Sequence, residues 1–295
     1  MISNRTNNFK IADFYISIIF TESHINNMTL LSSFEPFRTN YVSGGLFFKL
    51  TIDDSISQRK ANDAIGTFDT GNGNTEVYSL EDGGYQYIIN NTEGKYCCLL
   101  QTNKDFSECV CALNGDTRMR AFGLNNALML IFAFVGSLHE TLLIHASAVC
   151  HNDKGFAFTG KSGTGKSTHT DLWMKYIEGT ELINDDNPVL RVLGNKTYIY
   201  GSPWSGKTPC YKQKRIHLGA ITQIVRAKED KIKRMNPAES FASSLPSCAS
   251  MKWDDKKYNA ICDTITKIIE NTPIYTLYCL PDEKSARICQ RTISK

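Results

Sequence analysis

Hydrophobic and polar positions divide the chain into two halves with different periodicities. In the first half, short segments rich in aromatic and β-branched residues alternate with turn-forming clusters such as Asp82-Gly83-Gly84. This pattern predicts strands at residues 9–21, 41–52, 66–68, 76–80, 85–90 and 95–101. Six short strands with frequent turns favour an antiparallel sheet or a small sandwich up to about residue 115.

The second half alternates apolar strand-length runs with longer helical patterns. Helices are expected at 122–138, 166–177, 237–245, 258–270 and 282–294. Strands are expected at 141–150, 155–159, 181–183, 188–193, 197–200, 216–227 and 274–280. We therefore predict an α/β protein (α+β overall) with a β-rich domain at 1–120 and a second domain at 121–295.

Composition narrows the functional classes. The chain has 295 residues, of which 41% are hydrophobic and 21% charged, as expected for a soluble globular protein. A net charge of +3 without a long Lys/Arg cluster does not predict nucleic-acid binding. The ten cysteines include no C-x-x-C pair, which disfavours a zinc site or a disulfide framework. No targeting segment is found, and the apolar run at 127–138 is too short to span a bilayer. We expect a cytoplasmic protein without a membrane partner.

Residues 160–167 match the phosphate-binding pattern G-x-x-x-x-G-K-[ST] at every fixed position. Glycines allow a tight turn that directs backbone N–H groups at phosphates, the lysine reaches the β- and γ-phosphates, and the serine hydroxyl binds Mg²⁺. A predicted strand precedes the loop and a predicted helix follows it, as the motif requires. The pattern indicates a site for ATP and Mg²⁺, with nucleotide-binding residues Gly160, Ser162, Gly163, Thr164, Gly165, Lys166, Ser167 and Thr168.

Two further features suggest chemistry. Asp185 and Asp186 end a predicted strand 19 and 20 positions after Lys166, where one carboxylate can hold Mg²⁺ and another can accept a hydroxyl proton. The alternative is an ordinary Asp-Asp-Asn-Pro turn. His145 lies on the strand before the loop strand, as a catalytic or phosphate-sensing group or as a core histidine.

Two other segments are candidates. Residues 201–208 predict a loop just beyond the aspartates, which either covers the site or packs Trp204 inward. Lys214, Arg215 and Arg226 are candidate clamps for the γ-phosphate.

The segments 145–149, 158–168 and 182–186, in this order and spacing, resemble the catalytic core of HPr serine kinase/phosphorylase, which is related to phosphoenolpyruvate carboxykinase. The resemblance covers about a sixth of the chain. It implies a P-loop kinase core, with Lys166 on phosphate, Ser167 and Asp186 on Mg²⁺, Asp185 as the base, and His145 at the family's histidine position. Thr168 departs from the glutamate that this family usually has after Lys-Ser.

The resemblance implies an ATP-dependent kinase that transfers the γ-phosphate to a hydroxyl, of serine type, on a protein, peptide or small molecule. The alternatives are a phosphoenolpyruvate-carboxykinase-like phosphotransferase and a non-catalytic ATP-binding sensor. The first domain is expected to recognise the acceptor or to pair subunits in a homo-oligomer, since in-line transfer requires an aligned acceptor.

Overall fold

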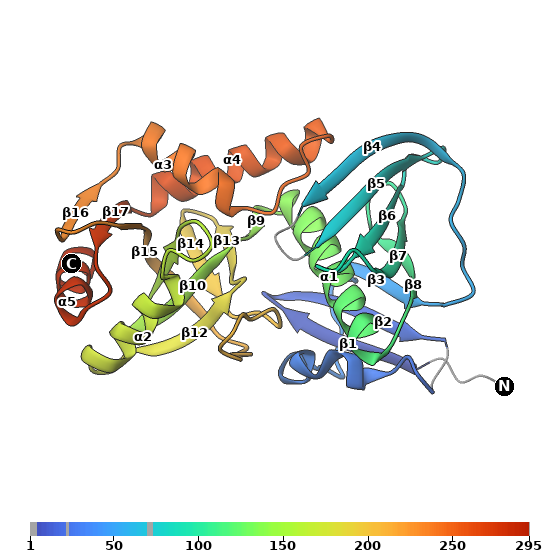
Figure 1. Cartoon of the computed structure of the whole chain (residues 1–295), viewed down its shortest axis with the longest axis horizontal. Helices are drawn as coiled ribbons and strands as arrows, with labels where there is room; N and C mark the ends of the chain where they lie inside the picture. The colour runs from blue at the N-terminus through green and yellow to red at the C-terminus, as the bar shows by residue number, and fades with distance from the viewer. Residues whose placement is uncertain (1–4, 22–23, 70–72, 295) are drawn as a thin grey trace. The chain divides into compact units, whose positions relative to one another are not determined.

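The computed structural model of the chain describes residues 5–21, 24–69 and 73–294 and is a mixed α/β structure with two sheets (Figure 1). The chain divides into two compact units, Met1–Val135 and Gly136–Lys295, each with its own sheet. The division falls within the last turn of helix α1 (Thr117–Ser137), 15 residues beyond the boundary expected at residue 120.

The first unit contains a sheet of eight strands within its described residues, in the order β1-β2-β3-β8-β7-β6-β5-β4. A 3₁₀ segment, η1, lies between β2 and β3 and packs on β1. The elements are β1 (Arg5–Ile11), β2 (Phe14–Phe20), η1 (Met28–Phe37), β3 (Phe48–Ile52), β4 (Ala61–Asp69), β5 (Asn74–Leu80), β6 (Tyr85–Asn90), β7 (Tyr96–Thr102) and β8 (Glu108–Leu113).

This sheet is mixed, whereas the sequence pattern favoured an antiparallel one. β3 runs parallel to both β2 and β8, because the η1 segment carries the chain back to the starting end of β2 before β3 begins. The expected single strand at 9–21 is a hairpin instead, with Ala12 and Asp13 at positive φ in its turn.

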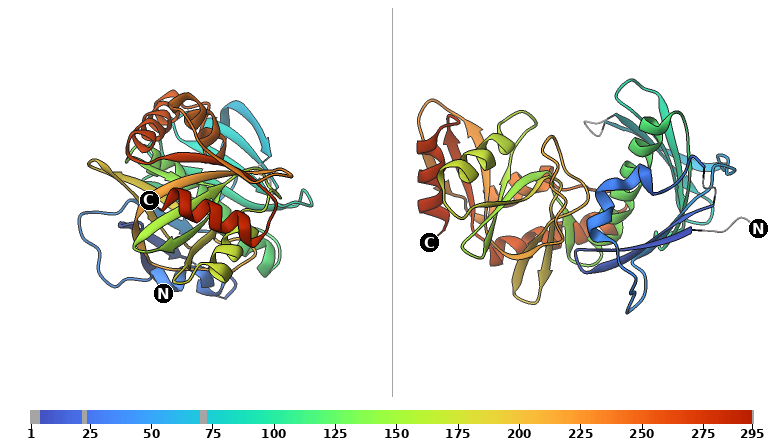
Figure 2. Two further views of the ribbon diagram at one scale, coloured as in Figure 1. Left: turned by 90° about the vertical axis from the view of Figure 1, so that its left-hand side faces the viewer. Right: turned by 90° about the horizontal axis from the view of Figure 1, so that it is seen from below.

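Helix α1 lies against the sheet of the first unit and forms its core (Figures 1 and 2). Phe132 packs edge-on against Phe14 and Phe47 of the sheet side, with ring centroids 6.3 and 5.5 Å away. In the part of the chain that the structure describes, α1 is the one helix whose length and composition would allow a membrane span, and 56% of its most apolar window is buried. A core helix has the same composition, and Phe132 packs as a core residue does.

The second unit contains a nine-stranded sheet within its described residues, ordered β12-β10-β11-β15-β14-β13-β9, with β17 beside β15 and β16 beside β17. The strands are β9 (Thr141–Leu143), β10 (Ala146–His151), β11 (Lys154–Thr159), β12 (Glu181–Asp186), β13 (Val189–Leu193), β14 (Lys196–Tyr200), β15 (Arg215–Arg226), β16 (Lys231–Arg234) and β17 (Ile274–Cys279). The helices are α2 (Lys166–Tyr176), α3 (Pro237–Ser244), η2 (Leu245–Ser247), α4 (Asp255–Asn271) and α5 (Glu283–Ile293).

Helices cover both faces of this sheet, with α2 and α5 on one side and α3 and α4 on the other (Figure 1). Alternation along the strands explains the arrangement. On β11, Phe156 and Phe158 join the cluster around Trp173 of α2, whereas Ala157 joins the cluster around Ile265 of α4. Because both faces are buried, β11 carries the consecutive apolar residues Phe156, Ala157 and Phe158 rather than an alternation of apolar and polar ones.

The expected strand at 141–150 is broken at Ile144 and His145. Before the break, β9 pairs with β13; after it, β10 pairs with β11 and β12. The His145 N–H donates to the carbonyl of Ser247 at 2.7 Å, so the segment after α3 holds the break in place. The change of strand partner puts His145 at the edge of the sheet where β12 ends.

Candidate functional site

Residues 160–165 form a loop between β11 and α2, and Lys166 and Ser167 are the first residues of α2. Gly160 and Gly165 have φ values of 144° and 105°, which L side chains rarely adopt. A Cβ on Gly160 would also lie 2.8 Å from Oγ1 of Thr164. The two glycines are therefore needed for this backbone path. Gly165 is the N-cap of α2 without a side-chain cap, which leaves the first N–H groups of the helix available to an anion.

Lys166 is the cation of this loop. Its side chain curls back over the turn, where Nζ donates to the carbonyl of Gly160 at 3.2 Å, and the residue is only 8% exposed. Burial lowers the pKa of Lys166, and the carboxylates of Asp186 and Asp185 oppose that shift. Helix α2, which begins at Lys166, packs against β12, so the loop and the two aspartates that end β12 lie on the same side of the sheet.

Arg226, at the end of β15, supports the loop from outside. Its Nη2 donates to the carbonyl of Gly163 at 2.8 Å, and its Nε donates to that of Thr164 at 3.4 Å. The sequence suggested a γ-phosphate clamp, but the guanidinium engages loop carbonyls instead. The two bonds tie the loop to the end of β15 and hold its backbone path.

The other two candidate clamps lie elsewhere in the second unit. Lys214 forms an ion pair with Glu181. Arg215 stacks over Tyr198, with its Cζ 4.1 Å from the ring centroid. Both contacts are structural, so neither residue is assigned to phosphate.

Asp185 belongs to the α2 side of the sheet. It is the register partner of Ser147, and side chains of paired residues share a face. The Ser147 hydroxyl lies 2.9 Å from that of Thr170 on α2, whose Oγ1 donates to the carbonyl of Ser167 at 2.8 Å. Asp185 is 3% exposed. Its Oδ2 accepts from the N–H of Thr208 at 3.3 Å.

Asp186 and His145 form the more open side of the site. His145 Nε2 lies 3.3 Å from Asp186 Oδ1, and their side chains are 47% and 31% exposed. Burial raises the pKa of Asp186, opposed by His145 and Lys166. Burial also lowers the pKa of His145, with Lys166 adding to the shift and Asp186 opposing it. His145 is thus joined to the charged groups of the site and is not a core histidine.

Asn184 organises the strand end and was not identified from the sequence. It is fully buried, and its Nδ2 donates to the carbonyls of Ser202 and Trp204 at 3.3 and 3.1 Å. Its Oδ1 accepts from the N–H of Asn187 at 2.9 Å. The sequence feature that could have identified Asn184 is its position directly after the apolar pair Leu182-Ile183, because an amide side chain on a buried strand needs hydrogen-bond partners.

His169, two residues after Ser167, is a core residue. It is 2% exposed, and its Nε2 accepts from Nε1 of Trp173 at 3.1 Å. Burial lowers the pKa of His169 to about 4, so its imidazole is neutral at physiological pH. His169 therefore supports α2 through packing and brings no charge to the loop.

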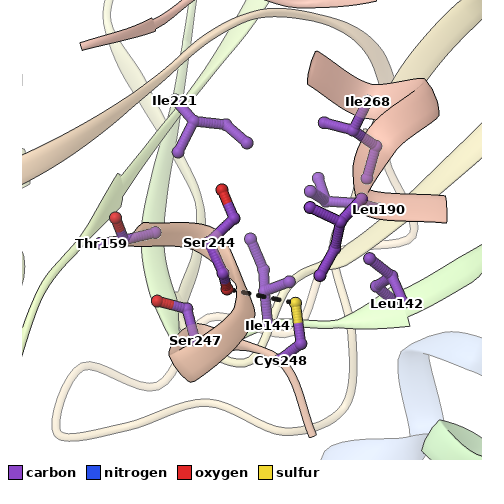
Figure 3. Close-up of a pocket in the computed structure, with 10 residues that line it drawn as sticks. Leu142, Ile144, Thr159, Leu190, Ile221, Ser244, Ser247, Cys248 and Ile268 are labelled. Carbon is purple, nitrogen blue, oxygen red and sulfur yellow. Dashed lines mark hydrogen bonds between the residues drawn. The ribbon is translucent and has the colours of Figure 1, made fainter. Parts of the chain in front are cut away.

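A small apolar cavity lies on the opposite, α4 side of the sheet (Figure 3). Ile144, Ile221 and Ile268 are among its lining residues, and its volume is about 20 Å³, which is room for about one water molecule. The Cys248 thiol at its wall donates to the carbonyl of Ser244 at 3.4 Å, and burial raises the pKa of Cys248 to about 12. The cavity is too small for a nucleotide, and the thiol is protonated.

Ser167 at the start of α2 and Asp186 at the end of β12 are compatible with Mg²⁺ as ligands. Mg²⁺ in nucleotide sites takes one or two carboxylates or hydroxyls, and phosphate oxygens and water complete its octahedron. Ser167 and Asp186 supply groups of this kind. Among the residues that the structure describes, no three His, Cys, Asp or Glu side chains gather as a metal cluster, which such a site does not require.

No protein-family model matches the chain, and no curated protein sequence matches it. Among solved structures, the HPr(Ser) kinase/phosphatase from Coxiella burnetii is similar at a TM-score of 0.32 and 11% identity. The match covers 52% of this chain and 93% of that one. A TM-score this low does not establish a shared fold, so the function must be argued from the site.

Proposed function

We propose that the protein is an ATP-dependent kinase that transfers the γ-phosphate to a hydroxyl of a protein, peptide or small molecule. The observation that carries the proposal is the position of two adjacent carboxylates at the end of β12, beside the loop: Asp185 shares a sheet face with Ser147, whose hydroxyl lies 2.9 Å from that of Thr170 on α2. A loop that only binds nucleotide needs the lysine and one metal ligand. A second carboxylate beside the same loop is what proton removal from an acceptor requires.

In this proposal, ATP lies with its phosphates against the 160–167 loop and the N-terminus of α2. Lys166 neutralises the β- and γ-phosphates, while Ser167 and Asp186 hold Mg²⁺. Asp185 takes the proton of the acceptor hydroxyl as its oxygen attacks the γ-phosphorus. His145 sits beside Asp186, where an imidazole N–H can donate to a γ-phosphate oxygen. The first unit is proposed to position the acceptor.

Ligand-induced stabilisation tests the nucleotide site. Mg·ATP at 100 times its Kd should stabilise the folded chain by about 2.7 kcal/mol and raise its Tm accordingly. Lys166→Met should remove most of that shift, because the loop loses the charge that meets the phosphates. Lys161→Met is the matched control, since Lys161 is an exposed lysine of the same loop.

The Tm shifts of the two variants are compared. Loss of the shift in Lys166→Met, with the shift kept in Lys161→Met, supports nucleotide binding at this loop. An equal ATP shift in Lys166→Met and the wild-type protein would place any nucleotide elsewhere and contradict the proposal.

A further inference from the structure

Residues 205–209 lie over the carboxylate that the proposed kinase uses as its base. Ser205 forms a bridge with Asp186, and the N–H of Gly206 donates to the carbonyl of Asp185. Two residues later, the N–H of Thr208 donates to Oδ2 of Asp185 at 3.3 Å. Asp185 is 3% exposed, whereas residues 206–209 are exposed on their outer side. This segment, the 205–209 strap, separates the base from solvent.

Buried contacts hold both ends of the strap. On one side, Asn184 bonds the carbonyls of Ser202 and Trp204, both of which are buried. On the other side, the buried Cys210 thiol donates to the carbonyl of Ile183 at 3.3 Å. The strap itself contacts β12 through the Ser205–Asp186 bridge and the N–H groups of Gly206 and Thr208, and within it Ser205 Oγ donates to the carbonyl of Thr208 at 2.7 Å. It is thus a largely exposed five-residue segment between two buried anchors.

We propose that the 205–209 strap is an acceptor gate, which covers Asp185 until an acceptor hydroxyl displaces the Thr208 N–H. The proposal rests on the kinase function proposed above. Its physical purpose is the exclusion of water, which competes with any acceptor for the γ-phosphate. In the closed state, Asp185 is hydrogen-bonded and shielded, so ATP bound at the loop is not hydrolysed.

Water is the probe of this gate, because it needs no knowledge of the natural acceptor. With the strap lifted, a water oxygen attacks the γ-phosphorus. The bond from that phosphorus to the bridging oxygen breaks, its electron pair leaves with ADP, and the proton of water passes to Asp185. The products are ADP and inorganic phosphate, so hydrolysis reports opening of the strap.

Gly206→Ala should open the strap selectively. A Cβ at this position would lie 2.5 Å from the carbonyl oxygen of Asp185, so the strap must move away from β12. ATP hydrolysis should rise by roughly tenfold or more over wild type, since a positioned base contributes about 10²–10⁴-fold. Adding Asp185→Asn to Gly206→Ala should remove the increase. Lys196→Ala, an exposed change at the start of β14, should keep the wild-type rate.

The outcomes separate the gate from the kinase function. If Mg·ATP stabilises the wild-type chain but Gly206→Ala hydrolyses ATP at the wild-type rate, the gate is wrong and the nucleotide site stands. If Mg·ATP stabilises neither protein, the proposed function fails first.

Hydrogen exchange of the wild-type chain gives a second test that does not depend on the variant. The amides of Gly206 and Thr208 should exchange at least about tenfold faster than those of β12, because a gate opens without unfolding the strand. Equal exchange rates in the strap and in β12 would overturn the proposal.

Discussion

His145 Nε2 lies 3.3 Å from Asp186 Oδ1 at the open edge of the second unit's sheet. The pair joins a strand break to the end of another strand, and both side chains remain partly exposed. Its charge state depends on pH. Below its lowered pKa, the imidazole is protonated and forms an ion pair with the carboxylate proposed to hold Mg²⁺. Four expectations follow from this arrangement and its neighbours.

Mg²⁺ binding should weaken in acid. Protonation of Asp186, whose pKa is raised from 3.8, and of His145, whose pKa is lowered from 6.5, both weaken metal binding as the pH falls from 6.5 to 4.5. The Mg²⁺ concentration that half-saturates ATP binding should rise by roughly 3- to 10-fold over this range. In His145→Gln the rise should be smaller, because no imidazolium competes. His217→Gln, an exposed histidine on β15, is the control, and an unchanged pH dependence in His145→Gln would contradict the pairing.

The two aspartates should give different defects. Asp186→Asn should raise the Mg²⁺ requirement about tenfold, because a metal ligand loses its charge. Asp185→Asn should leave nucleotide affinity nearly unchanged and lower turnover by about 10²–10⁴-fold, the usual contribution of a positioned base. Titration calorimetry with Mg·ATP measures the first effect. Single-turnover hydrolysis in the Gly206→Ala background measures the second. Exchanged phenotypes would reverse the assignment of base and metal ligand.

Replacement of Arg226 should weaken ATP binding more than it slows turnover. Arg226→Lys keeps the charge but cannot reach the carbonyls of Gly163 and Thr164 with a two-pronged group. Loss of one or two such bonds should weaken ATP binding by about 5- to 20-fold, with kcat nearly unchanged. Arg234→Lys, on an exposed strand of the same unit, is the control. A fall in kcat at constant KM would instead favour a phosphate clamp.

His169 should make the folded state sensitive to acid. Its pKa of about 4 lies below the ordinary value of 6.5, so between these values the unfolded chain binds more protons. The buried neutral His169 therefore leaves the free energy of unfolding at its full value above pH 6.5. About 3 kcal/mol of that free energy is lost as the pH falls toward 4. His169→Gln keeps an acceptor for Trp173 and should flatten the decline of the free energy of unfolding, measured with urea from pH 6.5 to 4.5. An equal decline in both proteins would exclude His169 as its source.

The loop at 160–167 and the order of its neighbours could be predicted from the sequence. Positive φ at Gly160 and Gly165 and the start of α2 at Lys166 are local properties, determined by residues within one turn. The strand that enters the loop was also predictable, because burial on both faces leaves the consecutive apolar residues Phe156, Ala157 and Phe158. The break at His145 was not, since the apolar pattern of 141–150 continues across it.

Only the tertiary structure decided which groups meet. Arg226 donates to the carbonyl of Gly163, which is 63 positions away in the sequence, and the Thr208 N–H donates to Asp185, which is 23 positions away. The local sequence pattern predicts neither contact. The sequence by itself determined that a glycine-rich turn, a lysine and two adjacent carboxylates are present, because each depends on near neighbours along the chain. Contacts between distant segments determined that α2 packs against the strand that carries the carboxylates and that the strap covers Asp185. Side-chain direction at a strand end follows from register and from the segments packed over it, and both are set by contacts between residues far apart in the sequence.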